Sequence, residues 1–164
     1  MIKIETRKMV FETDLKTRMD TKTNEGYIEG YFVVFGQETE LWPGVYEEVH
    51  PRALDNSLKN NNILCLDNHD TRVVLGSTDS NTLELKTDSK GLYGKVKLDL
   101  EDPFAKSAFR KVSTGKVKGC SFGFNIIDEE IENREDGTVK FLLREVDIKE
   151  VSITAFPAYP TTSI

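Results

Sequence analysis

The sequence predicts a β-rich α+β fold, a closed or nearly closed antiparallel β-barrel with a few helices packed outside. Most apolar residues lie in short segments that are rich in β-branched and aromatic side chains and are bounded by turn-forming residues. Only two segments have apolar residues at helical spacing, and strands and helices do not alternate regularly. Many strands with few helices favour a barrel or sandwich over a parallel α/β sheet.

The length of 164 residues fits one domain, so we expect a single domain over residues 1–164. Residues 1–25 are a polar N-terminal segment in which the alternation of Ile2 and Ile4 allows a short strand. Residues 155–164 are expected to form an extended C-terminal loop. The chain stops at Ile164 without an obvious ending signal, which suggests truncation or processing.

The first 100 residues contain five expected strands. Residues 27–36 are β-branched and aromatic and lie between glycines, and Trp42-Pro43-Gly44 then marks a turn or loop. Residues 92–100 alternate apolar and polar side chains, as a half-buried strand does. The shorter apolar pieces are residues 63–66, 73–75 and 83–85.

Two short helices are expected outside these strands. Residues 50–58 are predicted to be helical because Pro51 suits a first turn and two leucines follow four residues apart. In the second helix Asp102 is the expected N-cap, Pro103 the first helical residue and Gly115 the stop. The apolar stripe of this helix comprises Phe104, Ala105, Ala108, Phe109 and Val112.

The last third of the chain is predicted to consist of strands. Residues 117–127 form one strand, and Asp136-Gly137 is a hairpin turn between residues 129–134 and 139–143. Residues 146–154 form the last strand. Its apolar positions change phase across Lys149 and Glu150, which predicts a β-bulge or a change of buried face and turns Glu150 inward.

Charge and composition exclude several classes of protein. The chain has 22 Lys and Arg against 28 Asp and Glu, a net charge of −6, which argues against a nucleic-acid partner. No apolar run approaches the ~20 residues of a membrane span, and no signal peptide is visible, so we expect a cytosolic protein. Two cysteines and two histidines form no zinc or disulfide pattern, and we expect neither a metal nor another cofactor.

Gly119-Cys120-Ser121-Phe122-Gly123 matches G-x-S-x-G, the nucleophile elbow of α/β-hydrolases. That interpretation fails because a strand continues after the serine and because both histidines precede it. On a strand, Ser121 lies between two glycines, so a substrate backbone could approach it closely, at Gly119 and Gly123. The alternative is a β-bulge or a tight crossing in the barrel wall.

A nucleophilic serine needs a general base and a carboxylate, and the sequence offers candidates for both. His69, directly after an apolar strand, could act as general base, or it is an ordinary turn residue. Glu150 could hold the imidazole, with Glu145 and Asp147 as alternatives. His50 is expected to be a helix-cap residue. Cys120, like Cys65, is expected in the core and unreactive.

Several motifs then occur in one order between residues 26 and 163. They are Gly30 to Gly36, Val49-His50-Pro51-Arg52-Ala53-Leu54, Asn68-His69-Asp70, Leu75-Gly76, Lys90-Gly91-Leu92, Gly115 to Phe124 and Glu150 to Pro160. This ordered set resembles the prohead maturation protease family of tailed bacteriophages, which is related to the herpesvirus assemblins.

The resemblance implies a serine peptidase with a β-barrel core ringed by helices. Carried over by motif, His69 is the base, Ser121 the nucleophile and Glu150 the third member. Assemblins use a second histidine instead, but no histidine follows Ser121 here. Arg144 is a candidate to hold a water or the oxyanion.

The family's substrates are the capsid scaffold, the scaffolding segment of the major capsid protein, and the protease itself. The resemblance therefore implies action inside the procapsid in the host cytoplasm, and assembly as a homodimer or larger oligomer. The alternative is a non-catalytic capsid assembly or scaffolding protein on the same fold. An unrelated β-barrel binding module would leave the ordered motifs unexplained.

Overall fold

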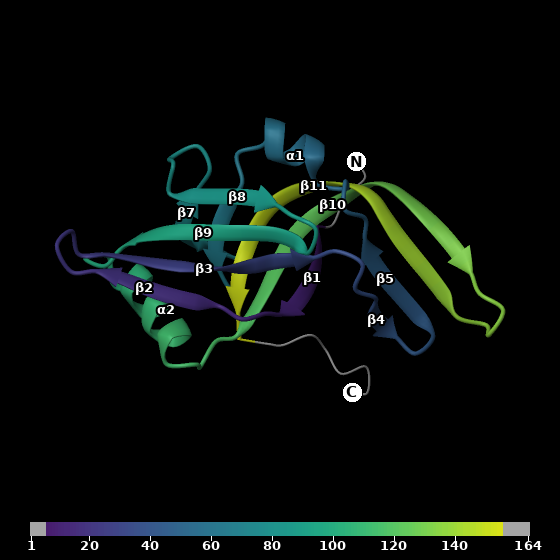
Figure 1. Cartoon of the computed structure of the whole chain (residues 1–164), viewed down its shortest axis with the longest axis horizontal. Helices are drawn as coiled ribbons and strands as arrows, with labels where there is room; N and C mark the ends of the chain where they lie inside the picture. Colours follow the sequence, from purple (N-terminus) through teal and green to yellow (C-terminus); the bar gives the residue numbers. More distant parts are fainter. Residues whose placement is uncertain (1–5, 156–164) are drawn as a thin grey trace.

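The computed structural model describes residues 6–155, which form strands in two sheets and two helices (Figure 1). The smaller sheet is antiparallel throughout, in the order β2-β3-β9-β8. Its strands are β2 (Lys16–Asp20), β3 (Glu25–Val34), β8 (Leu83–Thr87) and β9 (Gly91–Asp99).

The larger sheet is built on its longest strand, β11 (Val139–Thr154). On one side β11 pairs antiparallel with β10 (Gly119–Asn133), which in turn pairs with β1 (Arg7–Glu12). On the other side β5 (Val45–Val49) lies parallel to the start of β11, and β6 (Leu64–Asp67) lies parallel to its end. The outer strands β4 (Thr39–Trp42) and β7 (Asp70–Ser77) pair with β5 and β6.

The β-rich class with two helices is confirmed, but the two sheets do not form the predicted closed or nearly closed antiparallel barrel. Among the described residues the larger sheet ends at β1, β4 and β7, the smaller one ends at β2 and β8, and no pairing joins the two sheets. Two of the contacts of β11 are also parallel rather than antiparallel. Alternation along a strand shows which face is buried, whereas the partner of each edge depends on long-range packing that the pattern does not contain.

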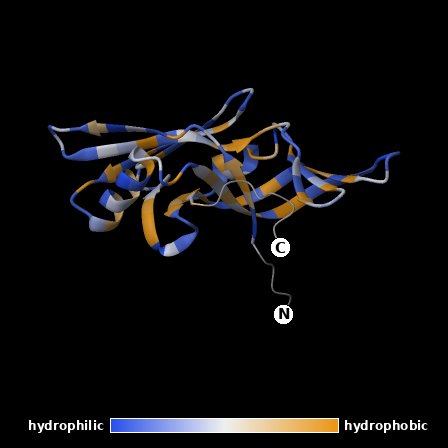
Figure 2. Ribbon diagram, turned by 90° about the horizontal axis from the view of Figure 1, so that it is seen from below, coloured by the Kyte–Doolittle hydropathy of each residue, from blue (hydrophilic) through white to orange (hydrophobic). Residues whose placement is uncertain are grey.

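The hydrophobic core lies where the two sheets and α2 (Pro103–Ser113) pack together. The sheets approach so closely that a Cβ added to Gly76 of β7 would lie 2.7 Å from Cγ2 of Val96 on β9. A Cβ on Gly26 would similarly lie 2.8 Å from the ring of Phe109 on α2. Figure 2 shows hydrophobic and hydrophilic segments alternating along the strands, as half-buried strands require.

The helix after Asp102 forms as predicted, and the first predicted helix is shorter than expected. The Asp102 side chain accepts a hydrogen bond from the backbone N of Phe104, which caps α2. Four of the five residues predicted to form its apolar stripe are buried. The prediction is wrong for Phe104, which is 63% exposed. α1 spans Asp55–Asn60, and the residues before it form a turn in which Ala53 N donates to the His50 carbonyl.

Four strands lie in segments where the sequence predicted none. β1 and β2 occupy the polar N-terminal segment, and β1 buries Met9 and Phe11 in the core. β4 and β5 flank the predicted turn at Pro43-Gly44. The expected strand around Ile2 and most of the C-terminal loop lie outside the described residues.

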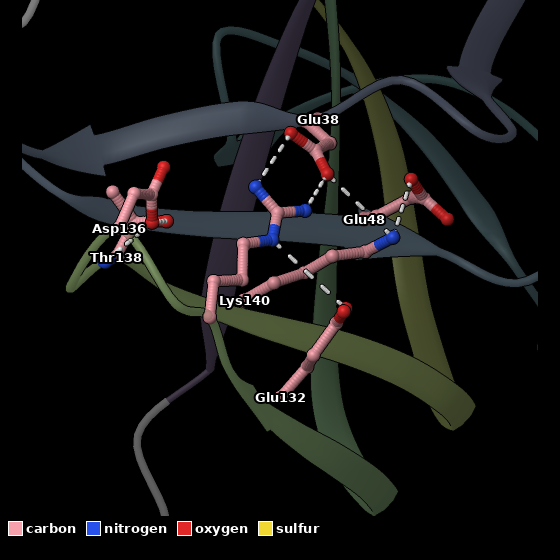
Figure 3. A network of polar contacts seen from close by, with 7 residues as sticks. Glu38, Glu48, Glu132, Asp136, Thr138 and Lys140 are labelled. Atoms are coloured by element: carbon pink, nitrogen blue, oxygen red, sulfur yellow. Dashed lines mark hydrogen bonds and ion pairs between the residues drawn. The ribbon is translucent and has the colours of Figure 1, made fainter.

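The predicted Asp136-Gly137 turn joins β10 and β11, and charged side chains surround this end of the hairpin (Figure 3). The Arg134 guanidinium pairs with Glu38, and Lys140 Nζ lies 3.0 Å from Glu48 Oε1. The Arg134 hydrogen bond lowers the pKa of Glu38. Neither helix within residues 6–155 is long and apolar enough to cross a membrane.

Candidate active site

Ser121 is the third residue of β10, and a strand lies on each side of it. It is opposite Val10 of β1 and opposite Ser152 of β11. Alternation along β10 sends Cys120 and Phe122 into the core and Ser121 to the other face. Even so, the Ser121 side chain is 0% exposed.

His69 comes from the tight turn between β6 and β7. Asp67 pairs with Asp70, so Asn68 and His69 form a two-residue hairpin loop, with φ of 52° and 60°. Two positive φ values are the pattern of a type I′ turn, in which a histidine is strained because its Cβ disfavours the left-handed region. The Asn68 N–H donates to the Ile153 carbonyl at 2.8 Å, which holds this turn against β11.

Glu150 directly follows the predicted bulge in β11. Gly123 is paired with Glu150 and Phe124 with Ile148, so Lys149 is the extra residue. Glu150 is 9% exposed. Glu150 is in regular register with Ser152 two residues further on, so its carboxylate lies on the face of Ser121, whereas the bulge returns Ile148 to the core face.

The three side chains meet at hydrogen-bond distance. His69 Nε2 lies 2.9 Å from Ser121 Oγ, and His69 Nδ1 lies 2.7 Å from Glu150 Oε2. A carboxylate at Nδ1 favours the tautomer with its proton on Nδ1, which leaves the Nε2 lone pair directed at the serine. The group can therefore accept a proton from Ser121.

A second acceptor competes for that proton. Ser121 Oγ also lies 2.6 Å from the Met9 carbonyl oxygen of β1. A hydroxyl has one proton, so Ser121 donates either to Met9 or to His69 at any moment. Within this structure Ser121 Oγ thus faces His69 Nε2 and is also held by β1.

The other carboxylates considered for the third position are engaged elsewhere. Asp147 accepts from Asn61 at 2.7 Å and pairs with Lys149, and these contacts lower its pKa. Glu145 is paired with Asp128 in the register of the β10–β11 hairpin, away from Gly123. The structure brings neither of them to His69.

The structure assigns Gly123 a different neighbour from the one expected. A Cβ on Gly123 would overlap Glu150 Oε2, so this glycine makes room for the Glu150 carboxylate, and the approach of a substrate backbone here stays a prediction. Gly119 pairs with Glu12 and Thr154 and lines a cavity of about 270 Å³ beside the strand. That a substrate backbone approaches at Gly119 stays a prediction.

Arg144 lies away from the serine. It precedes Ser152 on β11 by roughly 25 Å along the strand, at about 3.3 Å per residue. Its guanidinium pairs with Glu130 at 2.9 Å in the hairpin arm. In this structure it is not placed to hold an oxyanion at Ser121.

The remaining histidine and the two thiols play no part in this group. His50 Nδ1 accepts from the Arg52 backbone N–H, next to the start of α1. Cys65 and Cys120 are 0% exposed, and burial raises the pKa of both thiols, that of Cys120 to about 12. A thiol that stays protonated and buried is a poor nucleophile.

Sequence reasoning did not find Ser152 or Met9 as neighbours of the site. Ser152 had one available signal, because a residue two positions after Glu150 on a strand shares its face. Met9 contributes a backbone carbonyl, for which no side-chain pattern gives a signal.

A serine, a histidine and a carboxylate joined in this order is the arrangement by which serine peptidases activate their nucleophile. The chain is a serine peptidase, since residues 13–164 match the model of a serine protease family. That family is described as caudovirus prohead serine protease, and the chain belongs to it. The resemblance found in the sequence is thus confirmed.

Among solved structures, the capsid assembly protease gp21 of bacteriophage T4 has a similar fold. The two sequences are 16% identical, and the similarity covers 94% of this chain and 96% of that chain with a TM-score of 0.50. At this identity the likeness shows the fold alone. A search of curated proteins found no match to this sequence.

Proposed function

We propose that this prohead protease cleaves peptide bonds with Ser121 as nucleophile, His69 as general base and Glu150 as the residue that orients His69. The observation that carries the proposal is the continuous pair of contacts at His69, 2.9 Å to Ser121 Oγ and 2.7 Å to Glu150 Oε2. Family membership alone does not assign these roles to particular residues.

The proposed reaction is acyl transfer. Ser121 Oγ attacks the carbonyl carbon of the scissile bond while its proton passes to His69 Nε2. The imidazolium, held by Glu150, then gives that proton to the leaving amine as the C–N bond breaks. Water repeats the sequence on the acyl-enzyme and releases the new carboxyl end. Backbone N–H donors must stabilise the oxyanion, since Arg144 is remote.

Access to Ser121 requires a local rearrangement. The side chain has no exposed surface and lies within 2.6 Å of the Met9 carbonyl. A substrate carbonyl must come within about 3 Å of Oγ to react. The burial of Ser121 and its contact with Met9 support a resting state, in which β1 shifts around Met9 before a peptide binds productively.

The substrates that we propose are the scaffold and major capsid proteins of the same phage, and the protease itself. The family description as prohead protease and the capsid assembly role of the T4 neighbour support this proposal. Cleavage would take place inside the procapsid, and the active form would be a homodimer or larger oligomer. The meeting of Ser121, His69 and Glu150 favours this enzyme over a non-catalytic assembly protein on the same fold.

The test is co-expression with the capsid and scaffold proteins of the cognate phage, followed by mass spectrometry of the products. Ser121→Ala should abolish cleavage, His69→Ala should reduce it at least about 10³-fold, and Glu150→Gln about 10²- to 10⁴-fold. Ser57→Ala is the matched control, because Ser57 is also a buried serine but contacts only backbone. Equal cleavage by the unmodified chain and by Ser121→Ala would overturn the assignment.

A further inference from the structure

We propose that Ser152 is a positioning residue of this peptidase, whose hydroxyl joins the acid of the catalytic group to the loop that carries the base. The inference rests on the proposed roles of His69 and Glu150. It concerns a residue that does not touch the reacting atoms and that acts through its two neighbours.

Ser152 lies at the centre of the constellation. It is opposite Ser121 in the β10–β11 register, it shares the face of Glu150, and it is 0% exposed. Its Oγ donates to Glu150 Oε1 at 2.5 Å. The same oxygen accepts the backbone N–H of His69 at 3.0 Å.

These contacts close a ring of hydrogen bonds. Glu150 Oε1 is held by Ser152 and Glu150 Oε2 by His69 Nδ1, so both carboxylate oxygens have a donor. The backbone of His69 returns to Ser152. A carboxylate with only one donor could rotate about its last torsion, which is broad for glutamate. With two donors, its Oε2 stays directed at the imidazole.

The ring also fixes the strained turn. His69 adopts φ of 60°, which an L-residue keeps only when its surroundings hold it there. The Ser152 hydroxyl accepts the amide of that residue, and the Ile153 carbonyl accepts the amide of Asn68. Loss of the Ser152 hydroxyl would therefore loosen the carboxylate and the imidazole together.

A purely structural role would make Ser152 one buried serine among others, and Ser57 provides that comparison. Ser57 of α1 is 4% exposed, donates to the Val146 carbonyl at 3.0 Å and accepts from the Ile148 N–H at 2.9 Å. Both serines thus make one donated and one accepted hydrogen bond that involve β11. Only Ser152 contacts the proposed catalytic residues.

The experiment compares Ser152→Ala, Ser152→Thr and Ser57→Ala in the full chain. The first readout is the rate at which diisopropyl fluorophosphate labels Ser121, followed by intact-mass measurement, with Ser121→Ala as the blank. We expect Ser152→Ala to slow labelling about 10- to 100-fold, because small misplacements in an active site cost about that much. Ser57→Ala should remain within about twofold of the unmodified rate even if both variants melt at lower temperature.

The second readout is the NMR signal of the His69 Nδ1 proton. The chain has two histidines, so in a His50→Gln background His69 is the only one. The resonance of the Nδ1 proton bound to Glu150 should be sharp in the unmodified chain and in Ser57→Ala, and should broaden or shift in Ser152→Ala. Ser152→Thr keeps the hydroxyl and should restore it.

The outcomes separate this inference from the proposed function. If the unmodified chain is not labelled at Ser121, its resting state excludes the reagent; the co-expression test then decides the nucleophile, and the His69 proton decides the role of Ser152. If Ser152→Ala keeps both the labelling rate and the proton signal, or if Ser57→Ala loses them equally, Ser152 is not a positioning residue.

Discussion

Cys120 and Ser121 are neighbours on β10 that face opposite sides of the sheet. Cys120 packs in the core and accepts a hydrogen bond from Thr13 Oγ1 at 3.3 Å, whereas Ser121 contacts His69 and Met9. One step along a strand thus separates the side chain that stays inert from the one proposed to react.

Thiol-directed reagents should distinguish these two residues. At pH 8 iodoacetamide is expected to leave Cys65 and Cys120 unmodified in the folded protein, because both are fully buried and burial raises the pKa of both thiols. Peptidase activity should be unchanged after treatment. Mass spectrometry after denaturation should then find both thiols free. Modification of Cys120 with parallel loss of activity would point to a cysteine nucleophile instead.

Individual site residues could be predicted from the sequence where a local pattern of apolar and polar residues indicated them. The phase change at Lys149 predicted the bulge, which places Ile148 in the core and leaves Glu150 on the opposite face, where it meets His69. Arg144 was chosen by charge alone, and its distance from Ser121 depends on the length and register of β11. Ser152 was missed because its importance comes from a neighbouring loop, which no local pattern reveals.

At the scale of elements, the hairpin of β6 and β7 presents the base on a short and strained turn. The second position of a two-residue type I′ loop usually belongs to glycine, and here it is His69 with φ of 60°. The strained backbone conformation occurs at His69, the residue whose imidazole faces Ser121. Backbone strain of this kind is typical of functional sites.

This strain can be measured with two variants that both remove the imidazole. His69→Gly should be more stable than His69→Ala by about 0.5–1 kcal/mol, since only alanine keeps the Cβ that disfavours positive φ. Urea unfolding followed by fluorescence would give the difference. The same pair at Arg72, an exposed strand residue, should show the opposite order, since glycine weakens a strand. Equal stability of the two His69 variants would mean that the turn holds no strain there.

The elements themselves were predictable to the extent that each one has an apolar face. α2 and most strands of the core were visible as runs or alternations of apolar residues, whereas β1 was not predicted although it buries Met9 and Phe11. β2 and β4 were not predicted either, because neither strand has a fully buried side chain and their backbones are held by pairing with neighbours. Pairing partners lie far away in the sequence, so a local pattern does not predict such strands.

At the scale of the whole molecule, the larger sheet curls without closing. Arg7 on β1 lies 2.7 Å from Glu47 on β5, although β10 and β11 lie between these strands in the sheet. A twisted sheet brings distant strands together in this way. The β-rich class was predictable from composition and from the alternation of apolar and polar residues. Open sheets and a closed barrel differ only in which edge strands pair, and the pairing of edge strands depends on the packing of the whole chain.

The Arg7–Glu47 pair should make stability depend on pH. Glu47 is fully buried, and burial raises its pKa despite Arg7, so folding favours its protonated form. Protonated Glu47 therefore contributes to the stability of the folded protein below the ordinary glutamate pKa. This contribution is lost as the pH rises through the raised pKa of Glu47 in the folded protein. Arg7→Ala should cost about 1–3 kcal/mol at pH 7, because it leaves a buried carboxylate unpaired, and the cost should shrink as the pH falls and Glu47 takes up a proton. Urea unfolding between pH 4 and pH 8 would measure this difference.

Arg72→Ala is the control for the Arg7→Ala experiment. It changes the net charge equally but removes an exposed ion pair, so it should produce little loss of stability at either pH. A cost for Arg7→Ala that is the same at pH 4 and pH 8 would show that Arg7 acts through packing and not through the charge of Glu47.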